Sequence, residues 1–177
     1  MAAATITIRR PSFARMRHGG EPLIMSFKAD TAATWSANQI VAYNTATGKV
    51  SGAIGAAATA MLGLALSPCP YVTRTDLTEY PVLVFTEETL IAINVWANNT
   101  ATVANVITQV MLMEGTGYNV AVSASTQAVG QVLNVGSQAQ PVFLINEVTG
   151  NTKDDGIIGD LYQRVVVSIL LAARQWK

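Results

Sequence analysis

The chain has 177 residues and a formal net charge of +0, and its composition is 50% hydrophobic but only 12% charged. That apolar content excludes a disordered polymer, and the lack of net charge gives no long-range field to attract nucleic acid or an acidic membrane. Because ordinary soluble domains carry about 25% charged residues, the sparse charge favours a subunit whose surface is covered by neighbouring proteins.

Residues 1–28 are predicted to form an extended arm. They begin with an alternating run of Thr5, Ile6, Thr7 and Ile8, and Pro11 and Pro22 disfavour a helix in the rest of the segment. A segment of this kind gains stability mainly by adding a strand to a neighbour. A disordered tail is the alternative.

The arm is also basic, with a single acidic residue, Glu21, among its first 28 residues. We expect it to dock on acidic patches of a neighbouring protein, and a solvated basic tail is the alternative. Its cations are Arg9, Arg10, Arg15, Arg17 and Lys28.

Short β-type runs separated by turns come after the arm. Residues 39–43 have strand character, the polar turn 44–48 ends in glycine, and Lys49-Val50 resumes the pattern, which predicts a hairpin. The apolar run 61–66 contains Gly63 and predicts a buried strand that passes close to another backbone.

The second half continues in the same style. Runs 81–85 and 90–96 flank Glu87-Glu88 and predict a β-pair, whereas the apolar spacing over 103–111 predicts one amphipathic helix. Four further strands are expected, at 118–122, 131–135, 142–145 and 164–171.

These elements predict a mainly β fold: a compact β-sandwich or barrel-like body over residues 29–177, an extended N-terminal arm over 1–28, and one short helix. The proline-bracketed stretch at about 68–81 marks an internal boundary.

Catalytic chemistry is poorly represented. The only histidine is His18, in the arm, and the only cysteine, Cys69, has no partner for redox or zinc chemistry and is expected to be a small buried side chain. The acidic groups Glu87-Glu88 and Asp154-Asp155 with Asp160 are interpreted as solvated turns. We therefore expect no enzyme activity, no catalytic residue, no cofactor and no metal site.

The tryptophans Trp35, Trp96 and Trp176 allow two interpretations. They could stack on sugars, but aromatic residues at strand ends or at a terminus more often anchor a core or an interface, which is the favoured interpretation.

Several stretches carry a family resemblance. Residues 29–31, 36–44, 47–50 and 62–66 give a strand, a turn with Gly48-Lys49, an alanine-rich loop and a Gly-Leu-Ala-Leu strand. This succession resembles the small β-unit of tailed-bacteriophage head decoration, or cement, proteins. The second half, from Leu90 to residues 164–167, is similar to the β-rich body of related phage structural proteins.

The resemblance implies a structural virion protein, located on the outer capsid surface and assembled in the bacterial host cytoplasm. Its partners would be the major capsid protein and other copies of itself, as a homotrimer or alternatively a dimer, with no nucleic acid or membrane partner. The contact residues would be Thr5, Ile6, Thr7, Ile8, Arg9, Arg10, Arg15, Arg17 and Trp176.

Two other interpretations remain open on the sequence alone. A tail-tube or head-to-tail connector subunit would also be β-rich and catalytically empty. A glycan-binding fibre module would use the tryptophans.

Overall fold

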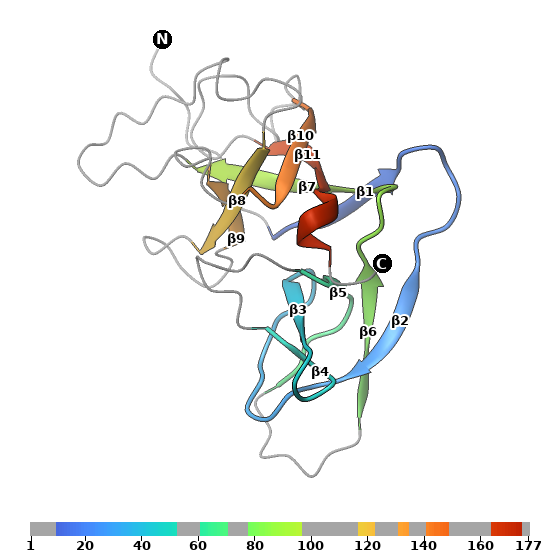
Figure 1. The fold of residues 1–177 in the computed structure, drawn as a ribbon, viewed down its shortest axis with the longest axis vertical. Coiled ribbons are helices and arrows are strands. Elements are labelled where there is room, and N and C mark those ends of the chain that lie inside the picture. The colour runs from blue at the N-terminus through green and yellow to red at the C-terminus, as the bar shows by residue number, and fades with distance from the viewer. Residues whose placement is uncertain are drawn as a thin grey trace, which may run out of the picture.

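The computed structural model describes residues 10–52, 61–70, 78–96, 117–122, 131–134, 141–148 and 164–174. Over these residues the fold is mainly β, as predicted, and consists of two sheets (Figure 1). No helix in these residues is long and apolar enough to cross a membrane.

The first sheet has six strands in the order β1-β7-β11-β10-β8-β9, and its neighbours in that order are antiparallel. β9, the last strand in this order, also pairs in parallel with the end of β7, the second strand. Its strands are β1 (Ser12–Met16), β7 (Thr89–Trp96), β8 (Gly117–Val122), β9 (Gln131–Asn134), β10 (Phe143–Glu147) and β11 (Arg164–Ile169).

The second sheet has five antiparallel strands in the order β2-β6-β5-β3-β4. Beyond the end of β2, the amide of Asp30 donates to the carbonyl of Val50 at 2.8 Å, so the two outer strands meet at one end. Its strands are β2 (Ile24–Lys28), β3 (Ile40–Asn44), β4 (Lys49–Ser51), β5 (Gly63–Ala65) and β6 (Glu79–Val84).

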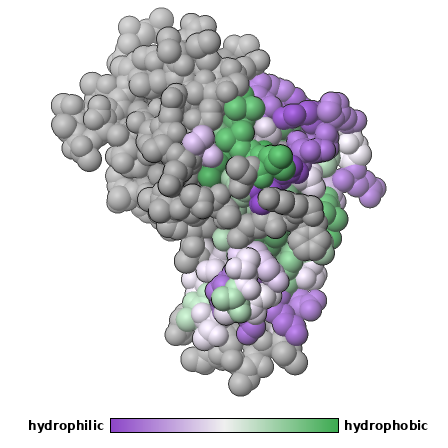
Figure 2. All heavy atoms as spheres, in the orientation of Figure 1, coloured by the Kyte–Doolittle hydropathy of each residue, from purple (hydrophilic) through white to green (hydrophobic). Residues whose placement is uncertain are grey.

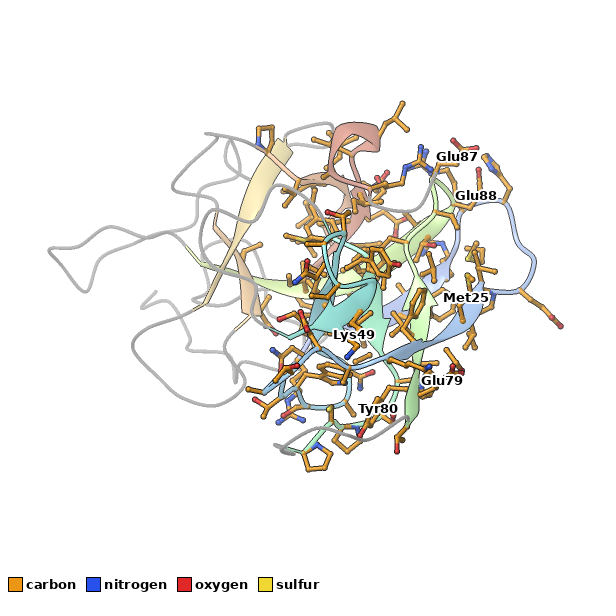
Figure 3. All side chains as sticks on the ribbon, turned by 60° about the horizontal axis from the view of Figure 1, so that its bottom comes forward. Met25, Lys49, Glu79, Tyr80, Glu87 and Glu88 are labelled. Atoms are coloured by element: carbon orange, nitrogen blue, oxygen red, sulfur yellow. The ribbon has the colours of Figure 1, made fainter. Side chains whose placement is uncertain are left out.

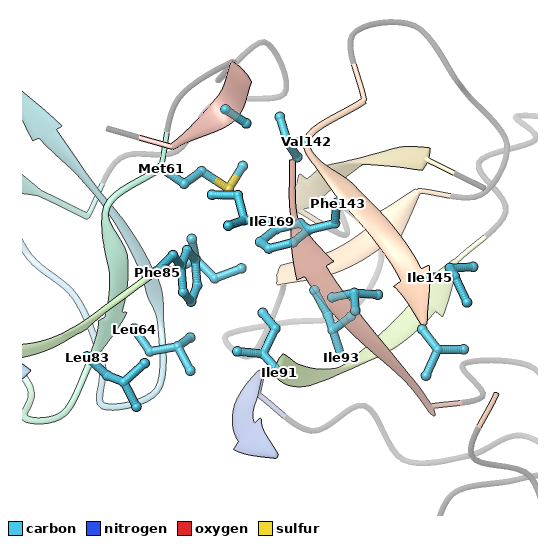
Figure 4. Close-up of a cluster of buried hydrophobic side chains, with 14 of the residues drawn as sticks. Met61, Leu64, Leu83, Phe85, Ile91, Ile93, Val142, Phe143, Ile145 and Ile169 are labelled. Carbon is cyan, nitrogen blue, oxygen red and sulfur yellow. The ribbon is translucent and has the colours of Figure 1, made fainter. Parts of the chain in front are cut away.

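A shared apolar core joins the two sheets. Alternation along the strands sends one set of side chains from each sheet into it (Figure 4). The rings of Phe85 and Phe143 meet edge to face across the boundary, with centroids 5.7 Å apart. Around this contact lie Ile40, Met61, Leu64, Leu83, Ile91, Ile93, Val95, Val142, Ile145, Val165, Val167, Ile169 and Ala173.

The opposite face of the five-stranded sheet has a core of its own. Trp35 is only 5% exposed, packs edge to face on Tyr80, and donates its indole N–H to the carbonyl of Ser67. Cys69, 2% exposed, lies in the same cluster, which confirms that it is a small buried side chain. Both faces of this sheet are therefore buried over much of their area.

Two local predictions in this sheet are confirmed. β3 and β4 form the expected hairpin, whose turn is closed by a 2.9 Å hydrogen bond from the Gly48 amide to the Asn44 carbonyl, with Gly48 at φ 70°. At Gly63, a Cβ atom would lie 2.0 Å from the carbonyl oxygen of Leu83. The glycine therefore allows β5 and β6 to approach closely.

The predicted pairing of the strands on either side of Glu87-Glu88 is wrong. β6 pairs with β2 and β5, whereas β7 pairs with β1, β11 and β9. Residues 85–88 carry the chain from one sheet to the other, because hydrogen bonds between Thr86 and Thr89 close a turn there. The chain also changes sheet between β1 and β2. β5 precedes the proline-bracketed stretch 68–81, β6 begins within it, and these two strands pair with each other.

The N-terminal segment also differs from the expectation. Ser12–Met16 and Ile24–Lys28 are extended, but they form β1 and β2, which pair with β7 and β6 of the same chain. This part of the segment belongs to the two sheets. Residues 1–9 lie outside the described residues, as does the helix predicted over 103–111. Within the described residues, the helical turn is the 3-10 segment Leu171–Ala173, which follows β11. The strand predicted over 164–171 is present but ends at Ile169.

Candidate interaction surface

The outer face of the six-stranded sheet carries a row of polar side chains, here called the polar face. Alternation places the even-numbered residues of β7 and β11 on this face, since the odd-numbered residues of both strands enter the shared core. Its polar members Asn94, Arg164 and Ser168 are buried, and Leu90 and Val166 lie on it as well. β1 lies along β7 at its edge. In Figure 2, hydrophilic residues gather on the side of the molecule where Figure 1 shows β1 and its turn into β2.

Arg164 fastens β1 to the sheet. It is only 6% exposed, and its Nη2 atom donates to Ser12 Oγ at 2.6 Å, to the Ala92 carbonyl at 3.0 Å and to the Arg10 carbonyl at 3.3 Å. Its Nη1 atom donates to Oδ1 of Asn94 at 3.2 Å. A buried guanidinium is costly unless its donors are satisfied. Here it links three strands and fixes the point at which the chain enters the sheet.

Arg17 extends the polar face across β11 and β10. Its Nη2 atom donates to Asn146 Oδ1 at 2.9 Å and to Ser168 Oγ at 3.2 Å, while Nδ2 of Asn146 donates to the same hydroxyl at 2.8 Å. The Arg17 amide donates to the carbonyl of Glu88. The guanidinium is thus held by neutral groups, and its positive charge is not cancelled by them.

Arg15 has an acidic partner in its own chain. Its Nη2 atom binds Oε1 of Glu147, and both side chains remain partly exposed, at 51% and 41%. The pairing register is irregular in both strands at this point, between Phe13 and Arg15 in β1 and between Ile145 and Glu147 in β10. Exposed pairs of this kind contribute about 0.2–1 kcal/mol, so the contact orients Arg15 more than it stabilises the sheet.

A second group of charges lies where the chain changes sheet. Nδ1 of His18, in the turn after β1, lies 2.6 Å from Oε2 of Glu88, and Nη2 of Arg174 lies 3.8 Å from Oε2 of Glu87. Figure 3 shows Glu87 and Glu88 together at this end of the molecule. These residues were expected to be a solvated turn, and Glu87 is largely exposed, but both bind cationic or protonatable side chains of the same chain.

The structure brings together some of the predicted contact residues. Arg10, Arg15 and Arg17 lie on or beside the polar face, although Arg15 and Arg17 are bound within the chain. Sequence analysis missed Arg164 and its partner Asn94. An arginine at the start of an otherwise apolar strand was the available signal. The remaining contact residues, Thr5, Ile6, Thr7, Ile8, Arg9 and Trp176, lie outside the described residues.

Asp30 has a structural role at the end of β2. Its carboxylate accepts hydrogen bonds from the amide of Thr31, from Nδ2 of Asn44 and from Oγ1 of Thr47. Burial raises the pKa of this carboxyl, but the three hydrogen bonds and the charge of Lys49 outweigh it and hold the pKa below its ordinary value. The charged form therefore ties the β2 end to the β3–β4 turn.

The candidate metal ligands and the tryptophans can be placed only in part. Among these residues, no three His, Cys, Asp or Glu side chains are grouped so that they could hold a metal ion. Asp154, Asp155 and Asp160 lie outside them. Trp35 is a core residue, as the packing interpretation predicts, whereas the side chains of Trp96 and Trp176 are not described.

No protein-family model, no curated protein and no solved structure matches the chain.

Proposed function

We propose that this chain is a structural virion protein that binds the outer surface of a phage capsid and stabilises contacts between major capsid proteins. The proposal draws on the family resemblance of residues 29–31, 36–44, 47–50 and 62–66 and on the sparse charge of a chain with only 12% charged residues. Its partners are the major capsid protein and other copies of the chain, in a trimer or alternatively a dimer, on the outside of the head.

The observation that carries the proposal is the anchoring of the basic N-terminal segment. β1 holds Arg15 and leads to Arg17 on one face, and Arg164 fixes the main chain at Arg10. The nine residues before Arg10 are therefore attached to the chain at a defined point beside the polar face. Arg17, bound by neutral groups, keeps its charge available for an acidic capsid patch.

The mechanism is multivalent adhesion. A single docking site of modest area binds weakly, but several arms on one oligomer raise the effective concentration of each arm at its site. The resulting avidity would hold adjacent capsid subunits together against the pressure of packaged DNA.

The test is binding to expanded, undecorated heads of the phage that encodes the chain. A variant that lacks residues 2–9 is the informative comparison, because a truncation at Ala29 would also remove β1 and β2 from the sheets. We expect saturable binding of the full chain, seen by imaging and by co-sedimentation, and a much weaker association of the truncated chain. Equal failure of both proteins to bind heads would contradict the proposal.

A charge test refines the same experiment. Arg17→Glu places a negative charge on the polar face, whereas Arg17→Gln removes the positive charge while keeping hydrogen-bond donors. Binding to heads should fall in the order wild type, Gln, Glu, with the difference shrinking as salt is raised. An unchanged affinity of the Glu variant would remove Arg17 from the contact.

A further inference from the structure

An irregularity in the pairing of β1 turns Arg15 onto the polar face. Phe13 pairs with Ile91, which enters the shared core. Arg15 pairs with the preceding residue, Leu90, so the pairing skips Ala14. Residues two apart in a regular strand share a face, so without the skipped residue Arg15 would lie on the core face with Phe13. The irregularity instead places it beside Leu90.

β10 has a matching irregularity. Ile145 enters the shared core, whereas Glu147 pairs with Val166 of the polar face. The pairing skips Asn146 between them. Glu147 is thereby turned to the same face as Arg15, and the two side chains bind each other. Irregularities of this kind often re-aim a side chain beside a functional site, and here two of them produce one ion pair that regular strands would not contain.

Arg17, which follows β1, brings a second guanidinium to this face. The residue is exposed, and its Nη2 atom is held by Asn146 and Ser168. Its Nε and Nη1 atoms bind no acceptor among the described residues. Because the N–H groups of a guanidinium form a planar fork that matches a carboxylate, the donors on these two atoms can bind an acceptor from outside the chain.

The group formed by Arg15, Arg17 and Glu147 is positively charged. Two guanidinium groups and one carboxylate leave one positive charge, and the side chains that hold Arg17 are neutral. Glu88, at the adjoining turn, is bound to His18. Arg15 and Glu147 are 51% and 41% exposed. Their attraction is therefore weakened by solvent, and a second carboxylate can reach them.

We propose that Arg15 and Arg17 form a binding site for a carboxylate of an acidic protein segment, and that Glu147 competes with it within the chain. In the free chain, Glu147 binds Arg15. In the complex, the carboxylate of the partner binds donors of both arginines and displaces Glu147 toward solvent. The inference rests on the proposed function only in naming the major capsid protein as the source of this segment.

The observed contacts favour a carboxylate over a row of phosphates. The acceptor that Arg15 already binds is a carboxylate. A nucleic acid binds through many cations that neutralise successive phosphates, whereas this group offers a single uncompensated charge on a chain whose net charge is +0. An acidic side chain of a protein matches that charge.

The experiment measures binding of a tetraglutamate peptide with blocked ends to the full chain, followed by the NMR signals of the arginine side chains. Glu147→Gln removes the competing charge and keeps the shape of the side chain, so affinity should rise about two- to fivefold. Glu79→Gln is the matched control, because it changes the net charge equally at an exposed position on β6 of the other sheet. The gain should shrink as salt is raised.

A second set of variants separates competition from a general effect of charge. Arg15→Gln leaves Glu147 without its partner and close to the site, so affinity should fall below that of the wild type. Adding Glu147→Gln to this variant should restore part of the affinity, because the repulsion from the freed carboxylate is gone. Arg17→Gln should weaken binding with or without Glu147→Gln.

Three results would overturn the inference. They are a Glu147→Gln protein that binds the peptide no more tightly than the Glu79→Gln protein, a tetraglutamine peptide that binds as well as tetraglutamate, and a single-stranded oligonucleotide that binds more tightly than either peptide.

Binding to phage heads keeps this inference separate from the proposed function. Head binding by the wild-type chain, with no effect of Glu147→Gln on heads or peptide, would refute the inference and leave the proposed function standing. Peptide binding that Glu147→Gln strengthens, without any binding to heads, would do the opposite.

Discussion

The two N-terminal strands of the molecule are held by different forces. β1 lies at the edge of the six-stranded sheet and is fastened by polar side chains, chiefly Arg164, while its central residues stay exposed. β2 lies at the edge of the five-stranded sheet and is fastened by the packing of Met25 and Phe27. The stability that buried polar contacts provide depends on each donor and acceptor having a partner, whereas the stability from apolar packing depends on the buried area. Substitutions should therefore release the two strands separately.

The largest effect is expected from a change in the core that both sheets share. Phe143→Ala removes a fully buried ring that contacts Phe85, the residue that follows β6 of the other sheet, at a cost of about 3–5 kcal/mol of unfolding free energy. Hydrogen exchange should rise together in β6 and β11, since the core belongs to both. A loss confined to the six-stranded sheet would show that the sheets unfold independently.

A smaller loss is expected from the apolar fastening of β2. Phe27→Ala removes a half-buried ring that meets Tyr43 edge to face, with centroids 6.0 Å apart. We expect a cost of about 2 kcal/mol, measured by denaturant unfolding. Faster hydrogen exchange should be concentrated in residues 24–28, and β1 should keep its protection.

The hydrogen bonds of Arg164 to β1 predict the opposite pattern of hydrogen exchange. Arg164→Met keeps much of the side-chain volume but removes the donors to Ser12, Ala92 and Asn94, and we expect a cost of about 1–2 kcal/mol. Here exchange should rise in residues 12–16 and not in 24–28. Arg164→Lys is a useful control, because it keeps the charge but cannot reproduce the planar set of donors. Unchanged hydrogen exchange of β1 in the methionine variant would show that Arg164 does not hold this strand in the sheet.

A still smaller effect is expected at the exposed end of the polar face. Replacing Arg15 with Ala and Glu147 with Gln, singly and together, should give a coupling energy of about 0.2–1 kcal/mol that falls at high salt. A coupling energy above about 2 kcal/mol would mean that this pair, and not Arg164, holds β1.

The last effect appears only in acid. The lowered pKa of Asp30 means that its charged form stabilises the folded chain above the ordinary carboxyl pKa, and that this contribution is lost as pH falls through the lower folded value. Asp30→Asn should therefore flatten the pH dependence of stability below pH 4, measured by thermal unfolding across a pH series. An unchanged acid profile in this variant would show that the carboxylate does not link β2 to the β3–β4 turn.

Part of the candidate surface could be predicted from the sequence. The excess of arginines before residue 28 predicted an interaction element, which stays a prediction, and Arg10, Arg15 and Arg17 lie on or beside one face. Their partners could not be predicted, because Asn146, Glu147, Ser168 and Arg164 are more than 120 residues away in the chain. Burial of a cation such as Arg164 depends on acceptors contributed by other strands.

The sequence by itself determined the local features of this protein. Alternation and turn residues gave most strand positions, the β3–β4 hairpin, and the close approach at Gly63, because these depend on neighbouring residues and on the space each side chain needs. Only the tertiary structure decided which strands pair. β6 and β7 lie on either side of a short turn yet join different sheets, and β1 and β2 become part of the body. The physical reason is that a strand edge can bond to any other, so the choice depends on which pairing buries both sets of apolar side chains in a common core.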